Sequence, residues 1–272
     1  MLAKRVLVAV ILLPIGVAAI YLGGWYFNSL VLVFMCLAAW EYTQLFRSGG
    51  FQPAIPLVIA GAFFLVGLRA WKGFEYSAEL ISFLILASMT YHLVAYERGQ
   101  EQSGTDFGIT LGGLFYLGWI GAYLISLRSL PNGAWWVLLV LPSVWIADSG
   151  AYFIGRAFGR HRFSPRLSPK KTWEGYFAGV IAGSLGGALL AYLWGFLAGP
   201  EWNVSPWLGA LLGFLLAVLT PLGDLGESMF KRQVGAKDSG KLLPGHGGIF
   251  DRIDSWLWAA VIGYYLANWL AR

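Results

Sequence analysis

Carboxylates and cations alternate around a glycine-rich turn near the C-terminal end of this chain of 272 residues. Asp224 is followed by Lys231 and Arg232, and a glycine-rich stretch then leads to Asp251 and Asp254. Carboxylates can hold Mg²⁺, the metal neutralises phosphate oxygens, and Lys or Arg side chains stabilise charge on a leaving group. The segment predicts metal-assisted transfer of a phosphoryl or nucleotidyl group, and a purely structural network of ion pairs is the alternative.

The spacing within this segment places several side chains on common helix faces. If residues 222–232 are helical, side chains three and four positions apart are neighbours. One face would then carry Asp224, Glu227, Ser228 and Lys231. Asp251 and Asp254 are also three positions apart, and the glycines before them let the backbone approach a ligand closely and present N–H groups.

A second polar segment lies upstream and offers cations to a phosphate. Asp148 lies inside an apolar run, where an ionisable residue is costly and is by default a functional candidate, or else a partner for a cation in the bundle. Ser168 and Pro169 predict a helix N-cap and a first helical residue. Lys170 and Lys171 would then lie in the first helical turn, where the helix dipole disfavours cations. A phosphate bound at this helix N-terminus would offset that cost. Contact with anionic lipid headgroups is the alternative.

The elements that position these side chains are predicted to be transmembrane helices. The chain is 58% hydrophobic and only 12% charged, whereas a soluble domain is about one-quarter charged. Its apolar runs approach the roughly 20 residues that a helix needs to cross a bilayer, and in lipid such runs must be helical. We predict an all-α, polytopic transmembrane bundle of about nine spans, or about eight if the first two form a re-entrant hairpin. The expected spans are 6–25, 27–46, 54–71, 77–96, 107–127, 134–155, 173–197, 206–226 and 255–271.

The distribution of cations predicts the orientation. With the N-terminus in the cytoplasm, most of the 19 Lys and Arg residues fall in cytoplasmic loops, as the positive-inside rule requires. The net charge of +5 then belongs to the membrane surface, and no nucleic acid is expected as a partner. We treat residues 1–272 as one integral membrane domain, with residues 1–130 as lipid-facing scaffold spans and residues 131–272 as the catalytic half.

Three stretches resemble the motif blocks of one enzyme family. The longest reads Ser228-Met229-Phe230-Lys231-Arg232, then Lys237-Asp238-Ser239-Gly240, then Leu243-Pro244-Gly245-His246-Gly247-Gly248-Ile249-Phe250-Asp251-Arg252-Ile253-Asp254. The others read Asp148-Ser149-Gly150-Ala151-Tyr152 and Ser168-Pro169-Lys170-Lys171-Thr172-Trp173-Glu174-Gly175. The long stretch resembles the diagnostic pattern of the phosphatidate cytidylyltransferases (CDP-diacylglycerol synthases). The resemblance covers residues 145–260, and the first five spans match only in hydropathy and length.

The resemblance implies a Mg²⁺-dependent reaction of CTP with phosphatidic acid that gives CDP-diacylglycerol and pyrophosphate. It also implies a paired cation site that uses Asp224 and Asp251, to which we add Asp254, and a homodimer in the bacterial inner membrane with its site on the cytoplasmic face. The predicted catalytic residues are Lys231, Arg232, Lys237, Asp238 and Arg252. The predicted substrate contacts are Asp148, Ser168, Lys170, Lys171, His246, Gly247 and Gly248.

Other functions compete with this prediction. A CTP-dependent lipid kinase would use related chemistry, whereas the Asp-Gly and Ala-Arg pattern of CDP-alcohol phosphotransferases and the Walker A loop are both absent from the sequence. A transporter could use Asp148 and Asp224 on an ion pathway. Transporters place such residues near the midplane, usually in related halves. Here the charges cluster in two surface segments of the C-terminal half, which favours an enzyme.

Overall fold

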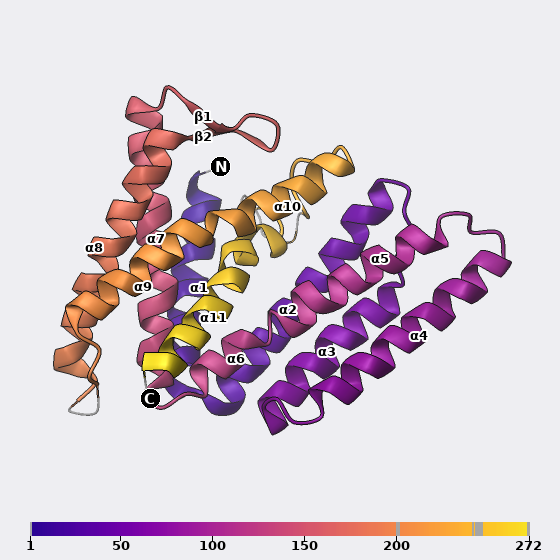
Figure 1. Ribbon diagram of the computed structural model, residues 1–272, viewed down its shortest axis with the longest axis horizontal. Coiled ribbons are helices and arrows are strands. Elements are labelled where there is room, and N and C mark those ends of the chain that lie inside the picture. Colours follow the sequence, from indigo (N-terminus) through magenta and orange to yellow (C-terminus); the bar gives the residue numbers. More distant parts are fainter. Residues whose placement is uncertain (1, 200–201, 241, 243–246, 271–272) are drawn as a thin grey trace. The chain divides into compact units, whose positions relative to one another are not determined.

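The computed structural model describes residues 2–199, 202–240, 242 and 247–270, and helices dominate it (Figure 1). The elements are α1 (Leu2–Leu22), α2 (Gly24–Ser48), α3 (Ile55–Lys72), α4 (Ser77–Glu97), α5 (Ser103–Gly113), the π-helical η1 (Leu114–Trp119), α6 (Tyr123–Arg128), α7 (Gly133–Phe158), β1 (Arg162–Ser164), β2 (Ser168–Thr172), α8 (Trp173–Leu197), α9 (Pro206–Leu219), α10 (Pro221–Gln233) and α11 (Phe250–Leu270). The prediction of an all-α, polytopic protein is confirmed at this level.

Within the described residues, seven helical stretches are long and apolar enough to cross a bilayer. They are Gly24–Ser48, Ile55–Lys72, Ser77–Glu97, Ser103–Arg128, Gly133–Phe158, Trp173–Leu197 and Pro206–Gln233. A shorter apolar stretch, Val10–Leu22, belongs to α1. The expected nine spans and the cytoplasmic N-terminus stay predictions.

The chain forms two compact units, and each is discontinuous in sequence. Unit 1 comprises Met1–Ser126 and Phe230–Ile253, and unit 2 comprises Leu127–Met229 and Asp254–Arg272. The boundary between the units therefore falls inside α10 and again inside α11. As a result, most of the longest motif block belongs with the N-terminal helices rather than with the spans that immediately precede it.

Aromatic rings of the N-terminal helices contact both ends of Phe230–Ile253, the C-terminal segment of unit 1. The ring of Tyr42 on α2 lies edge-on to Phe230 and to Phe250, with centroids 5.8 and 6.0 Å apart. Tyr116 of η1 contacts the same two phenylalanines, at 6.5 and 6.3 Å. Such edge-to-face pairs contribute about 0.5–1.5 kcal/mol each beyond the burial of their area. The two ends of the glycine-rich loop are therefore fixed against helices near the start of the chain.

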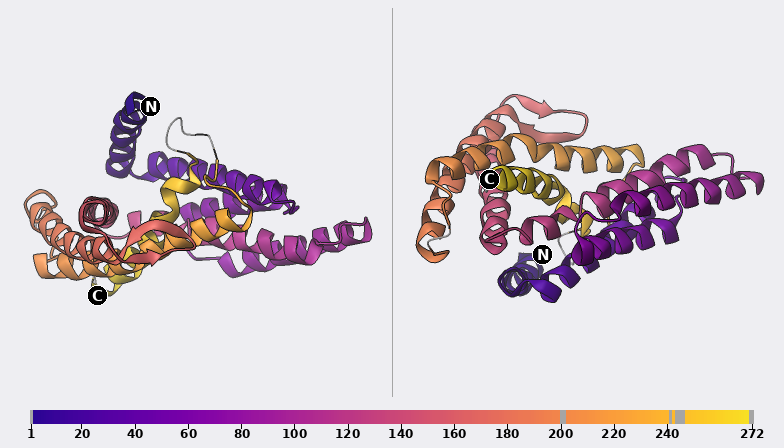
Figure 2. Two further views of the ribbon diagram at one scale, coloured as in Figure 1. Left: turned by 90° about the horizontal axis from the view of Figure 1, so that it is seen from above. Right: turned by 60° about the horizontal axis from the view of Figure 1, so that its bottom comes forward.

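In unit 2, α8 packs closely between α7 and α9, and the three helices lie side by side in both figures (Figures 1 and 2). A Cβ added at Gly179 would lie 3.0 Å from the carbonyl oxygen of Ala147 on α7. One added at Gly187 would collide with the backbone of Gly209 on α9. Glycines on this face therefore let the helix backbones touch, as small residues do in membrane bundles.

An antiparallel hairpin connects α7 to α8. Its strands pair Arg162 with Thr172 and Ser164 with Ser168. The ring of Phe163 stacks on Tyr176 at 5.1 Å and lies edge-on to Trp173 at 4.6 Å. The hairpin is thereby fixed to the first turns of α8.

The predicted helix start at Ser168 is wrong. Ser168 belongs to β2, and Thr172 caps α8 because its hydroxyl accepts a hydrogen bond from the N–H of Gly175 at 3.2 Å. Lys170 and Lys171 lie in the strand instead of the first helical turn. Pairing with β1 holds these residues in an extended conformation. The Ser168-Pro169 dipeptide could not predict this pairing, because a helix-capping signal depends only on neighbouring residues in the chain.

Candidate active site

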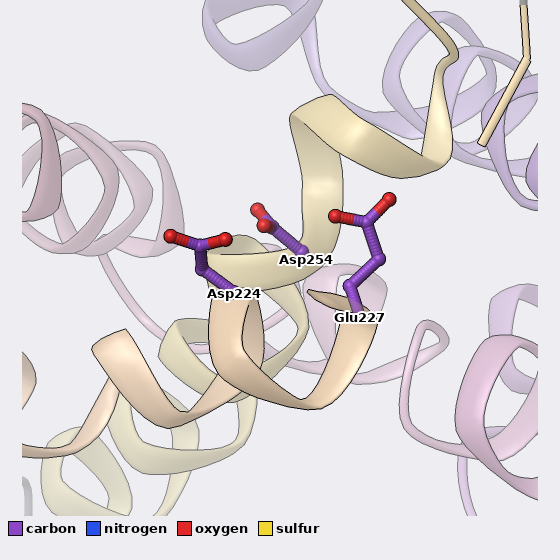
Figure 3. Close-up of side chains that lie close together, drawn as sticks. All are labelled: Asp224, Glu227 and Asp254. Atoms are coloured by element: carbon purple, nitrogen blue, oxygen red, sulfur yellow. The ribbon is translucent and has the colours of Figure 1, made fainter. Parts of the chain in front are cut away.

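Three carboxylates form a compact group in unit 2. Asp224 and Glu227 project from α10 and Asp254 projects from α11, and one oxygen of each lies within 4.8 Å of the others (Figure 3). Glu227 is 1% exposed and Asp254 is 8% exposed. Three carboxylates this close repel one another, so that a cation placed among them would be strongly favoured. An all-oxygen donor set of this kind suits Mg²⁺.

Helical spacing explains how this group forms. Residues 222–232 are helical, as predicted, so Asp224 and Glu227 share one face of α10. Glu227 was expected on that face but was not among the predicted metal ligands. The signal that could have identified it was its position three residues after Asp224. Asp224 and Asp254 were predicted ligands, and the structure brings them together.

A lysine of the hairpin reaches this group of carboxylates. The Nζ atom of Lys171 lies 2.5 Å from Oδ2 of Asp224, and both side chains are about one-third exposed. Asp148 of α7 interacts electrostatically with both residues. Arg156, a cation further along the same helix, donates a hydrogen bond to the hydroxyl of Tyr152 at 3.0 Å. Three predicted site residues thus meet in unit 2, although they come from α7, β2 and α10.

Asp251 organises the motif residues of unit 1. Its Oδ1 atom accepts a hydrogen bond from Nζ of Lys231 at 2.6 Å, and this ion pair is nearly buried, with side chains 6% and 10% exposed. Its Oδ2 atom accepts hydrogen bonds of 2.9 Å from the N–H and hydroxyl of Ser239 and from the N–H of Gly248. One carboxylate therefore gathers side chains and backbone from both ends of the glycine-rich loop.

A second buried carboxylate, which the sequence analysis missed, lies beside this loop. Glu41 of α2 is 1% exposed, and its Oε2 atom accepts a hydrogen bond from the N–H of Phe250 at 2.9 Å. A Cβ added at Gly248 would lie 2.5 Å from Oε2, and one added at Gly240 would collide with Oε1. A side chain at either position would have to displace the buried carboxylate. The available signal was an ionisable residue inside an apolar run, the same signal that singled out Asp148.

The remaining predicted residues lie at the surface or outside the described chain. Arg232, Lys237, Asp238 and Arg252 have exposed side chains. Gly247 adopts a φ of +85°, a backbone conformation that favours glycine. His246 lies outside the described residues. The proposed pairing of Asp224 with Asp251 stays a prediction, since the two residues belong to different units.

The chain is similar to known proteins along nearly its whole length. The model of the family described as "Cytidylyltransferase family" matches residues 3–270. The phosphatidate cytidylyltransferase of Synechocystis is 36% identical, with 96% of this chain and 95% of the relative covered. The Pseudomonas aeruginosa protein of the same name is 38% identical, with 100% and 98% covered, and that of Mycobacterium leprae is 32% identical, with 98% and 89% covered. This chain belongs to the cytidylyltransferase family.

Proposed function

We propose that this protein transfers the cytidylyl group of CTP to phosphatidic acid, giving CDP-diacylglycerol and pyrophosphate. The observation that carries the proposal is the group formed by Asp224, Glu227 and Asp254 in a chain that matches phosphatidate cytidylyltransferases over nearly its full length. The seven long apolar helical stretches found among the described residues fit this substrate. Its acyl chains can stay in the bilayer while the phosphate reaches a polar site.

We further propose that Asp224, Glu227 and Asp254 hold Mg²⁺. Their oxygens lie within 4.8 Å of one another, and hard oxygen donors are the ligands that this ion prefers. When bound, the ion would neutralise charge on the triphosphate. Lys171, which lies against Asp224, would contact a phosphate group from the same side. A second cation that uses Asp251 remains part of the proposal.

In the proposed reaction, a phosphate oxygen of phosphatidic acid forms a bond with the α-phosphorus of CTP. The bond from that phosphorus to the bridging oxygen of the β-phosphate breaks, and pyrophosphate leaves. The nucleophile is already an anion, so that the reaction needs positioning and charge stabilisation more than a general base. Exposed cations of the motif would offset charge on the triphosphate or the lipid phosphate. These cations are Lys237, Arg232 and Arg252.

The loop of unit 1 would contribute in a second way. Gly247 and Gly248 lie beside the buried carboxylates of Asp251 and Glu41, which fix the loop backbone. Gly247, with its positive φ, would present backbone N–H groups to a phosphate. Residues 131–272 would thus carry most substrate contacts and residues 1–130 would mainly form the scaffold, with Glu41 as an addition from that scaffold.

The proposed location is a bacterial inner membrane, with a cytoplasmic N-terminus and both polar segments facing the cytosol, where CTP is found. The bias of cations toward these segments supports this orientation. We also propose that the protein acts as a homodimer, an expectation that comes from the family resemblance.

The test is conversion of labelled CTP by the purified chain in detergent, with phosphatidic acid and Mg²⁺. Wild-type protein should form lipid-linked CDP, and Asp224→Asn and Asp254→Asn should each lower kcat at least about a hundredfold, because each removes a charged donor to the metal. Glu75→Gln, at an exposed position between α3 and α4, is the matched control and should be unaffected.

Two outcomes would contradict the proposal in different ways. If wild-type protein forms product and both aspartate variants keep most activity, the metal assignment is wrong. If phosphatidic acid is not converted although CTP binds, the substrate is wrong. Transfer of only the γ-phosphate of CTP to a lipid alcohol would instead support a CTP-dependent lipid kinase.

A further inference from the structure

The hairpin between α7 and α8 carries a concentration of positive charge. No Asp or Glu occurs between Asp148 and Glu174, whereas six Lys or Arg residues do. They are Arg156, Arg160, Arg162, Arg166, Lys170 and Lys171. All except Lys171 are exposed. Charge of one sign on so short an element creates a positive potential that attracts anions.

The protein supplies few counter-charges to this hairpin. Glu174, the acidic residue that follows it, is engaged by His161, with Nδ1 and Oε1 2.6 Å apart and the His161 N–H also directed at the carboxylate. Lys171 is engaged by Asp224. Among the described residues, no carboxylate lies within ion-pair distance of the outward cations. These outward cations are Arg160, Arg162, Arg166 and Lys170.

Aromatic side chains lie where the hairpin joins α8, a helix long enough to span a bilayer. Figure 1 shows β1 and β2 projecting to one side from the adjoining ends of α7 and α8, both of which are long enough to span a bilayer. Phe163 packs on Trp173 and Tyr176 in the first turn of α8, and Phe177 stacks on Trp173 at 5.9 Å. Trp173 and Phe177 are also exposed. Exposed Trp and Tyr rings are typical of the headgroup level of a membrane.

We propose that this hairpin binds the anionic phospholipids of the surrounding bilayer through Arg160, Arg162, Arg166 and Lys170. An aromatic anchor at headgroup depth holds the cations where lipid phosphates are concentrated, and each basic residue near an anionic surface strengthens binding about fivefold. Arg forms bidentate hydrogen bonds with phosphate, which suits the three arginines of the set. The three arginines are separate from the proposed catalytic function, because none of them is a proposed metal ligand or substrate contact, whereas Lys170 is also a predicted substrate contact.

The test measures lipid retention rather than activity. Wild-type protein is reconstituted in nanodiscs of equal parts phosphatidylglycerol and phosphatidylcholine, then extracted mildly, and the retained lipids are counted by native mass spectrometry. Phosphatidic acid is left out, so that the result does not depend on the proposed substrate. We expect phosphatidylglycerol to be enriched on the wild type. The enrichment should fall about tenfold or more in the Arg160→Gln/Arg162→Gln/Arg166→Gln variant.

A matched control variant removes three positive charges from another part of the protein. Arg47, Lys72 and Arg98 are exposed cations of unit 1, and their combined substitution by Gln should leave the enrichment unchanged. The proposal is overturned if the hairpin variant retains as much phosphatidylglycerol as the wild type, if the control loses as much, or if the wild type shows no preference. Should the triple variant fail to fold, Arg166→Gln at the turn, with a salt titration of the wild type, gives the same readout.

Discussion

Glu41 accepts a hydrogen bond from the backbone N–H of Phe250, which lies 209 residues further along the chain. Both groups are buried, and Phe250 is 0% exposed. Loss of the acceptor would leave this buried N–H without a partner, and an unsatisfied buried donor lowers the stability of the folded state. This bond joins α2 to the beginning of α11, where the diagnostic motif ends.

Replacing Glu41 should therefore change the conformation of the glycine-rich loop as well as the packing of α2. We expect Glu41→Ala to lower the free energy of unfolding by about 1–3 kcal/mol, because the Phe250 N–H loses its partner. The same change should lower kcat about tenfold or more. Glu41→Gln keeps a carbonyl acceptor and should recover most of both losses. Thermal unfolding in detergent and CTP turnover measure these effects, and equal behaviour of the two variants would contradict a positioning role.

Gly248 should tolerate no side chain. A Cβ there would lie 2.5 Å from Oε2 of Glu41 and would also collide with the hydroxyl of Ser239. We expect Gly248→Ala to lower turnover strongly because the loop must move away from its buried carboxylates. Gly108→Ala on α5, where nothing lies within 4 Å, is the matched control and should keep full turnover. Full activity of Gly248→Ala, measured beside this control, would show that the loop adapts freely.

The ion pair between Lys231 and Asp251 should be strongly coupled. Its side chains are 10% and 6% exposed, and removal of one partner of a buried pair costs about 3–5 kcal/mol. We expect Lys231→Met and Asp251→Asn each to destabilise the protein by that amount. The double variant should lose less than the sum, because the second change removes no further attraction. Unfolding measurements on the four proteins give the coupling, and simple additivity would mean that the pair contributes little.

The group of carboxylates predicts stabilisation by divalent cations that is measurable without substrate. A ligand that binds only the folded state raises its stability by about 2.7 kcal/mol at a hundred times its Kd. Mg²⁺ should raise the unfolding temperature of the wild type. Glu227→Gln should need at least about tenfold more Mg²⁺ for the same shift, since one charged donor is lost. Glu75→Gln should titrate as the wild type does, and an unchanged titration of Glu227→Gln would remove this residue from the metal site.

Features that depend on neighbouring residues in the chain could be predicted from the sequence. The span expected at 173–197 matches α8, because a long apolar run is enough to specify a helix in lipid. The meeting of Asp224 with Glu227 follows from a helical spacing of three. The first result rests on the length of the apolar run and the second on helical periodicity.

Features that depend on distant pairing could not be predicted in the same way. The Ser168-Pro169 dipeptide has the local signature of a helix start, yet its strand pairs with Arg162–Ser164, which no capping rule considers. Glu41 and Phe250 are brought together by folding across most of the chain. Asp254 was added to the predicted metal ligands because it lies three residues after Asp251, and only the fold brings it beside Asp224.

The division of the units inside α10 and α11 has a consequence for biosynthesis. Unit 1 includes Phe230–Ile253 and unit 2 includes Asp254–Arg272, so each unit draws on residues made late in translation. The hydrogen bond between Glu41 and Phe250 cannot form until the 209 residues that separate them in sequence have been translated. A chain truncated before α11 would therefore lack part of both units.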